Sequence, residues 1–164
     1  MPNSLALSNQ IIYNKAIGLV CFAYRNEKGE LQAPFMDYLE KYAIRERDSE
    51  KRKRHKVKQI MNLKGHLEYL IEYEGSYDKP PFIQKYHGRS VGILKVSESE
   101  NLVRIAFFVN RGNTIILLDA LDKPKLYEKG KKAQVDKGID RFLDRVERYK
   151  ADHESKNLSL PLIL

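Results

Sequence analysis

Three short apolar runs in the second half of the chain give the clearest structural signal. They span residues 91–96, 102–109 and 114–121, are dominated by Val, Ile, Leu and Phe, and are separated by short polar or turn-like breaks. Short runs of this composition between such breaks are typical of strands. Breaks this short favour antiparallel hairpins over crossover connections. The pattern therefore predicts an antiparallel sheet.

Side chains alternate across a strand, so each run has two faces. One face of the middle run is wholly apolar and comprises Val103, Ile105, Phe107 and Val109. The opposite face carries Arg104 among apolar neighbours, and Lys95 and Asp119 interrupt the flanking runs in a similar way. A charge inside a strand is costly unless its face is open or the charge is paired. We therefore expect one dry face packed on helices and one face that opens onto a basic groove.

Helical spacing of apolar residues marks three further segments. Residues 31–47, with Pro34 near the first turn, predict a helix, and residues 51–71 predict a second helix after a turn near Asp48 and Ser49. Gly65 lies inside the second pattern and could break it. An amphipathic pattern from Lys131 to Asp152 predicts a last helix. Residues 16–24 predict a first strand.

The expected fold class is α+β, with two N-terminal helices packed on a twisted, mainly antiparallel sheet of about four strands and a C-terminal helix. We divide the chain into a loose N-terminal segment (residues 1–15), a single domain (16–152) and an apolar C-terminal tail (153–164). An apolar tail of this kind docks in cis or on a partner.

Charge and cysteine content narrow the functional classes. The 164 residues suit one domain, and the net charge of +8 indicates either a polyanionic partner, with nucleic acid as the default, or simply a basic surface. The single cysteine, Cys21, forms no disulfide framework within one chain and is better read as a core residue than as a catalyst. The sequence has neither a signal-peptide pattern nor a membrane-length apolar run, so we expect a cytoplasmic protein.

The most basic stretch, residues 45–58, precedes and enters the second predicted helix. It offers Arg52, Arg54 and Lys58 as RNA contacts, and a solvated helix face is an equal alternative.

Most catalytic motifs are missing from the sequence. The four histidines are scattered without paired ligand spacing, and the glycines fit no phosphate-binding pattern, so we expect neither metal nor cofactor. Basic side chains can nevertheless cleave RNA, because the neighbouring 2′-hydroxyl supplies the nucleophile. Lys and Arg stabilise the phosphorane, and a lysine among other cations has a lowered pKa that suits proton transfer. A metal-free ribonuclease is therefore compatible with the sequence.

Four segments resemble the RelE/HigB toxins of type II toxin–antitoxin modules, in the phage-derived branch of the RelE/ParE superfamily. They are YRNEKGELQAPFMDYLEKY, PFIQKYHGRSVGILKV, LVRIAFFV and TIILLDALDKPK, and the similarity covers residues 16–150. The resemblance implies two N-terminal helices on one side of a twisted antiparallel sheet. It also implies ribosome-dependent, metal-free mRNA cleavage and inhibition by a cognate antitoxin, often a helix-turn-helix protein.

The resemblance also assigns roles to individual residues. Lys95 would bind phosphate or transfer protons, Arg104 would stabilise the phosphorane, and Lys123 would supply a basic group after the third strand. Tyr127 would stack on a base or act as an acid or base. Lys85 and Lys125 would contact RNA.

Two positions depart from the branch. Asp119 stands where a histidine is common, and Lys95 stands where arginine is usual, which loses bidentate phosphate geometry. Asp119 could pair with Arg104 or Lys123.

Each of these residues also has an ordinary explanation. Lys95 and Arg104 could form surface pairs with Glu98 or Glu100, and Tyr127 could be a packing residue. A catalytically silent nucleic-acid- or partner-binding protein of the same fold and a ParE-like gyrase inhibitor are the alternative functions.

Overall fold

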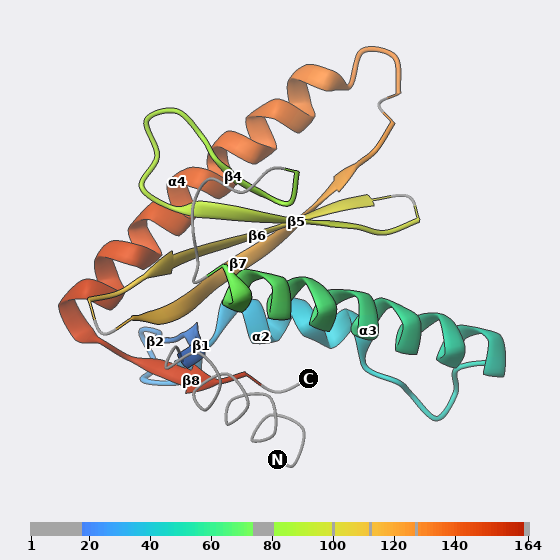
Figure 1. Cartoon of the computed structure of the whole chain (residues 1–164), viewed down its shortest axis with the longest axis horizontal. Helices are drawn as coiled ribbons and strands as arrows, with labels where there is room; N and C mark the ends of the chain where they lie inside the picture. Colours follow the sequence, from blue (N-terminus) through green and yellow to red (C-terminus); the bar gives the residue numbers. More distant parts are fainter. Residues whose placement is uncertain (1–17, 74–80, 100, 112, 127, 163–164) are drawn as a thin grey trace.

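A six-stranded mixed sheet runs through the structure, a computed structural model that describes residues 18–73, 81–99, 101–111, 113–126 and 128–162. Strands β4 to β7 form an antiparallel meander, so the predicted hairpins are confirmed (Figure 1). In spatial order the strands are β4 (Ile83–Lys85), β5 (Gly92–Ser97), β6 (Asn101–Val109), β7 (Thr114–Pro124), β1 (Gly18–Phe22) and β8 (Ser159–Pro161). A separate two-stranded ribbon pairs β2 (Tyr24–Arg25) with β3 (Leu31–Gln32).

The outer strands differ from the expected sheet of about four mainly antiparallel strands. Strand β1 lies parallel to β7, with Gly18 opposite Thr114, and the short strand β8 pairs antiparallel with β1. The apolar tail therefore docks in cis through β8, and the buried Leu162 follows it. Helix α4 (Lys132–Lys156) continues for about one turn beyond Asp152, where the sequence pattern predicted that it ends.

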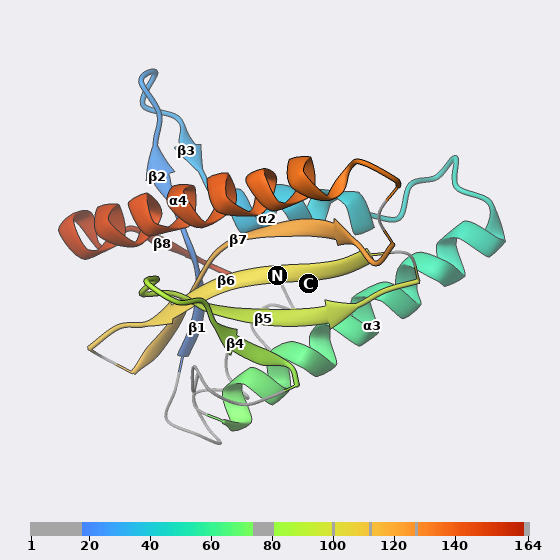
Figure 2. The same cartoon turned by 90° about the horizontal axis from the view of Figure 1, so that it is seen from above.

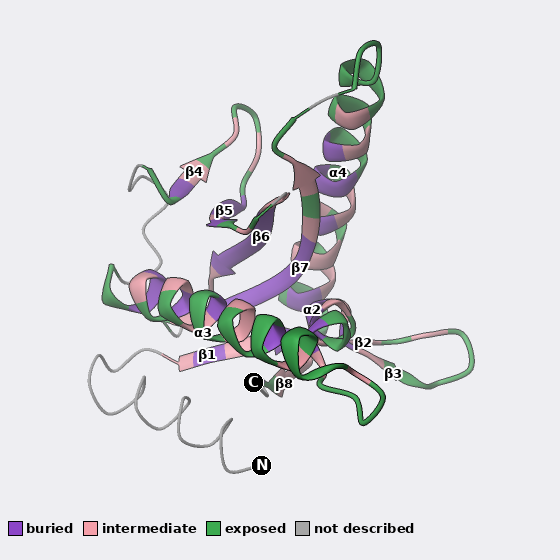
Figure 3. Ribbon diagram, turned by 90° about the vertical axis from the view of Figure 1, so that its right-hand side faces the viewer, coloured by how far each residue is buried: buried purple, intermediate pink, exposed green. Residues whose placement is uncertain are grey.

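Helices cover both faces of the sheet, and Figure 2 shows α3 (Glu50–Glu72) and α4 on opposite sides of the strands. Helices α2 (Pro34–Leu39) and α3 bury their apolar residues with the face that carries Val103, Ile105 and Phe107, as predicted. Figure 3 shows the buried residues of α3 and α4 mixed with exposed ones along each helix, as expected for amphipathic helices. Helix α4 packs on the face that we expected to be open, because Ala106 and Phe108 make that face apolar there.

The helices begin and end at recognisable signals. Helix α2 has Pro34 in its first turn and passes into a 3-10 turn, η1 (Glu40–Tyr42), so the first predicted helix is much shorter than residues 31–47. The Ser49 hydroxyl caps α3 by accepting a hydrogen bond from the Arg52 amide at 3.1 Å. Helix α3 continues through Gly65 without a break.

Candidate nucleic-acid interface

Lys95 and Arg104 lie directly opposite each other on the neighbouring strands β5 and β6. On the next strand, Lys123 lies opposite Leu102, which shares its face with Arg104. All three cations therefore lie on the α4 side of the sheet, at the end where β5 and β7 finish and β6 begins. We call these three residues the cationic cluster. It contains three of the four predicted catalytic residues.

The neighbouring cations act on the protonation of Lys95. The pKa of Lys95 is lowered from its ordinary value, first by burial and then by the positive charges of Arg104 and Lys123. Like charges disfavour the ammonium form, so the neutral fraction of Lys95 near pH 7 is larger than for an isolated lysine. Lys95 and Lys123 are half-buried, whereas Arg104 is only 6% exposed. A neutral amine beside two cations can accept a proton while they hold an anion.

Arg104 is held in place by an aromatic residue that the sequence analysis did not select. One terminal guanidinium nitrogen donates a hydrogen bond to the Tyr86 hydroxyl, and the Arg104 Cζ atom lies 5.6 Å from the centroid of the Tyr86 ring. Among the described residues, the Nε atom of Arg104 is buried without a hydrogen-bond partner. An unpaired buried donor is costly, so this guanidinium is held at an energetic cost to the fold.

The loop that carries Tyr86 is tied to α4. Arg89 forms an ion pair with Asp144 at 2.6 Å. The amide of Ser90 donates to Glu147 at 2.6 Å, and the Ser90 hydroxyl donates to the second oxygen of the same carboxylate at 2.5 Å. These contacts fix the β4–β5 connection, and they therefore fix the position of Tyr86 relative to Arg104.

Asp119 does not belong to the cationic cluster. Its carboxylate accepts hydrogen bonds from the Ala120 amide at 2.8 Å and from Arg145 Nε at 3.2 Å. Burial raises the pKa of Asp119, and these two donors only partly oppose that effect. Asp119 is thus a partner of α4 and not of Arg104 or Lys123, the two partners we considered from the sequence.

Glu98, one of the two acidic partners considered for Lys95 and Arg104, lies elsewhere. Glu98 accepts hydrogen bonds from the Tyr42 hydroxyl and from Gln59, which lie on the α2 and α3 side of the molecule. Glu100 lies outside the described residues.

The basic residues predicted to contact RNA are divided between the two sides of the sheet. Arg52, Arg54 and Lys58 are exposed on α3, on the side away from the cationic cluster. Lys85 is exposed and lies opposite Gly92, which in turn lies opposite Phe107, so register places it on the α3 side as well. These four residues do not join the cationic cluster.

The two remaining predicted residues follow β7. Lys125 is exposed just beyond the end of the strand, and Tyr127 lies outside the described residues. Tyr86, in contrast, is adjacent in sequence to Lys85 but faces the other way. Side-chain alternation implies that Lys85 and Tyr86 face opposite ways, but only the pairing register between β4 and β5 shows which of them faces the cationic cluster.

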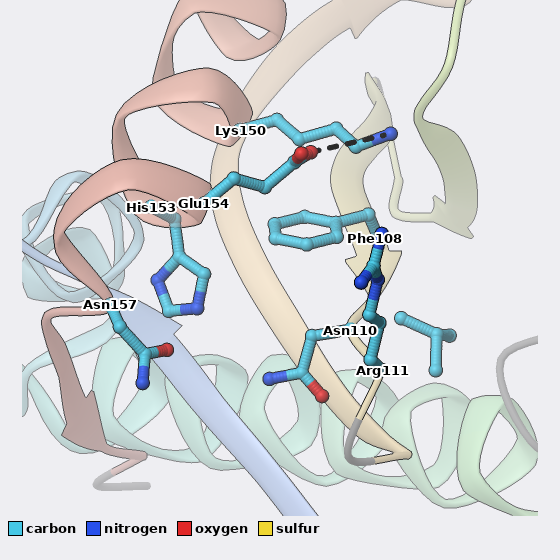
Figure 4. Close-up of a pocket in the computed structure, with 8 residues that line it drawn as sticks. Phe108, Asn110, Arg111, Lys150, His153, Glu154 and Asn157 are labelled. Atoms are coloured by element: carbon cyan, nitrogen blue, oxygen red, sulfur yellow. Dashed lines mark ion pairs between the residues drawn. The ribbon is translucent and has the colours of Figure 1, made fainter.

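A hollow of about 750 Å³ lies at the end of β6 opposite to the cationic cluster. Figure 4 shows Phe108, Arg111, Lys150 and His153 among the residues that line it. Lys150 lies 3.9 Å from Glu154, and its amine lies 5.5 Å from the centroid of the Phe108 ring. Lys150 thus already has a carboxylate and an aromatic ring beside it, and the hollow is separate from the cationic cluster.

Comparisons with models of protein families, with curated proteins and with solved structures found no match. Within the described residues, no three His, Cys, Asp or Glu side chains gather in a way that could hold a metal ion. None of the described helices combines the length and the apolar character needed to cross a membrane.

Proposed function

We propose that this chain is a toxin of the RelE/HigB type that cleaves mRNA at the ribosome without a metal ion. The observation that carries the proposal is the cationic cluster, in which Lys95, Arg104 and Lys123 lie on one face of three adjacent strands. The order of elements also supports it, since a first strand precedes two helices on one side of the sheet, followed by an antiparallel meander and a C-terminal helix. The resemblance further implies a cognate antitoxin as partner.

The residues of the cationic cluster suit the two demands of RNA cleavage. The first demand is to remove a proton from the nucleophile, and neutral Lys95 takes the proton of the 2′-hydroxyl as this oxygen attacks the adjacent phosphorus. For the second demand, Arg104 and Lys123 stabilise the negative charge that develops on the phosphorane oxygens. The bond to the 5′-oxygen then breaks and this oxygen takes a proton from water, which leaves a 2′,3′-cyclic phosphate on one fragment and a 5′-hydroxyl on the other, and Lys95 returns its proton to solvent.

Inducible expression tests this function. The wild-type chain should arrest growth and translation, and a variant carrying Lys95→Ala with Lys123→Ala should relieve the arrest at equal protein level. Both residues are half-buried, so these changes spare the core. The matched control is Lys28→Ala with Lys51→Ala, which removes the same charge from exposed positions outside the cationic cluster. Equal toxicity of the cluster variant and the wild type would refute the proposal.

A catalytically silent nucleic-acid binder is the second candidate. The burial of Arg104 favours it, because a guanidinium that is 6% exposed and bonded to Tyr86 gives a substrate limited access. This candidate predicts RNA binding that weakens steeply with salt and generates no new RNA ends. Blocked replication with intact mRNA would instead indicate gyrase inhibition.

A further inference from the structure

An apolar groove lies between the α2–η1 segment and the N-terminal half of α3, on the side of the molecule away from the cationic cluster. Its volume is about 400 Å³. Its apolar lining comes from Met36, Leu39, Ile44, Val57, Ile60 and Met61. The groove therefore offers space for a few apolar side chains.

Several residues of this groove leave large apolar side chains in water. Ile44 is 53% exposed, Val57 is 43% exposed and Met61 is 67% exposed. The described chain has four other exposed large apolar residues, namely Leu31, Tyr73, Phe82 and Leu126, and none of them lines the groove. Apolar side chains gathered at one hollow of a polar surface are typical of a site for another molecule.

The border of the groove is strongly basic. Between Arg45 and Lys64 the chain has nine Lys or Arg residues and only three acids. Within α3, Arg54 lies three residues before Val57 and seven before Met61, so the three share one stripe, and Lys58 lies one turn before Met61. Both Arg54 and Lys58 are exposed. The basic residues of α3 thus border apolar side chains.

The local acids offset only part of this charge, and one of them, Glu40, lines the groove and lies 3.8 Å from Arg45. Asp48 is shared between Arg52 at 3.3 Å and Lys56 at 2.7 Å, and Glu50 lies 3.5 Å from Lys53. Lys56 is buried and also donates to the Ala43 carbonyl at 2.8 Å, so it supports the floor of the groove. A ligand would therefore meet an apolar floor and a positive rim.

We propose that this groove binds an acidic amphipathic helix of a partner protein. Such a helix presents apolar side chains at positions i, i+3 or i+4 and i+7 to the groove, and its flanking carboxylates meet Arg54 and Lys58. A single-stranded RNA explains the basic rim but not the exposed Ile44, Val57 and Met61, because RNA is bound through phosphate contacts and base stacking on aromatic rings. The described rim therefore fits a protein helix better than RNA.

Binding of defined peptides to the purified full-length chain tests the proposal. The probe is a fluorescent helical peptide with Leu at the groove-facing positions and Glu at the flanking ones, and its control has Lys in place of Glu. Fluorescence anisotropy should show binding of the Glu peptide, at least tenfold weaker binding of the Lys peptide, and weakening with salt. Met61→Glu should weaken binding of the Glu peptide by at least tenfold, since it adds a negative charge to the groove.

Leu126→Glu is the matched control variant, because Leu126 is 87% exposed and lies outside the groove. It should bind the Glu peptide as the wild type does. Equal binding of the two peptides, or equal binding by Met61→Glu and Leu126→Glu, overturns the proposal. Competition by a single-stranded RNA that binds Met61→Glu as well as it binds the wild type also overturns the proposal, because it assigns the surface to RNA. A dimer of the wild-type chain that Met61→Glu dissociates overturns it too, because the groove is then occupied by a second copy. The assay contains no ribosome, so its failure leaves the proposed RNA cleavage untouched.

Discussion

Replacing Tyr86 with Phe removes one hydroxyl and leaves the ring that lies against Arg104. The lost contact is a hydrogen bond from a guanidinium that is 6% exposed and whose Nε is already unpaired among the described residues. A hydrogen bond to a charged group contributes about 1.5–3 kcal/mol, and we expect Tyr86→Phe to lower the free energy of unfolding by that amount. The ring–guanidinium contact at 5.6 Å survives the change, so it does not contribute to this loss.

A double-mutant cycle isolates this interaction. In the background of Arg104→Met the hydrogen bond to the guanidinium is already lost, so Tyr86→Phe should cost at least about 1 kcal/mol less than it does in the wild type. Urea unfolding followed by far-UV circular dichroism measures all four proteins. Tyr69→Phe serves as a control, because Tyr69 contacts Phe82 and Tyr73 through its ring.

The same cost for Tyr86→Phe in both backgrounds would refute the reasoning. It would show that the Tyr86 hydroxyl stabilises the protein without holding Arg104.

Three further predictions concern stability. Burial raises the pKa of the Asp119 carboxyl in the folded state, so this group stabilises the fold below the ordinary aspartate pKa of 3.8, and the contribution is lost as pH rises through the folded-state value. Asp119→Asn should make the free energy of unfolding, measured with urea from pH 3 upward, fall less steeply as pH rises. An unchanged slope would contradict the assignment of this pH dependence to Asp119. Leu162→Ala should cost about 2–5 kcal/mol, because Leu162 is fully buried next to β8. A cost near zero by thermal or urea unfolding would mean that the tail does not dock in cis. Ser49→Ala should cost about 1 kcal/mol through loss of the α3 cap, and Ser49→Asp should restore most of it.

Local patterns predicted the parts of the fold that depend on nearby residues. Alternation along residues 102–109 placed Val103 and Arg104 on opposite faces, and helical spacing located α3 and α4, because both periodicities follow directly from backbone geometry. The same alternation assigns Lys95 and Arg104 to one face of their strands, and the pairing of β5 with β6 sets them opposite each other.

Long-range pairing could not be predicted in this way. The pairing of β1 with β7 joins residues nearly a hundred positions apart, and no local pattern specifies such a neighbour. The partner of Asp119 is Arg145 on α4, which depends on how the helix packs across the sheet. Tyr86 was missed because a strand as short as β4 does not reveal from sequence which of two adjacent residues, Lys85 or Tyr86, faces the cationic cluster.

Mapping of RNA 5′ ends in cells that express the chain tests the central claim most directly. The wild type should generate new 5′-hydroxyl ends within translated mRNA, and the variant with Lys95→Ala and Lys123→Ala should generate none, while the control variant with Lys28→Ala and Lys51→Ala retains them. Identical ends from the wild type and the cluster variant, or no new ends from the wild type at a level that arrests growth, would contradict the assignment of RNA cleavage to the cationic cluster.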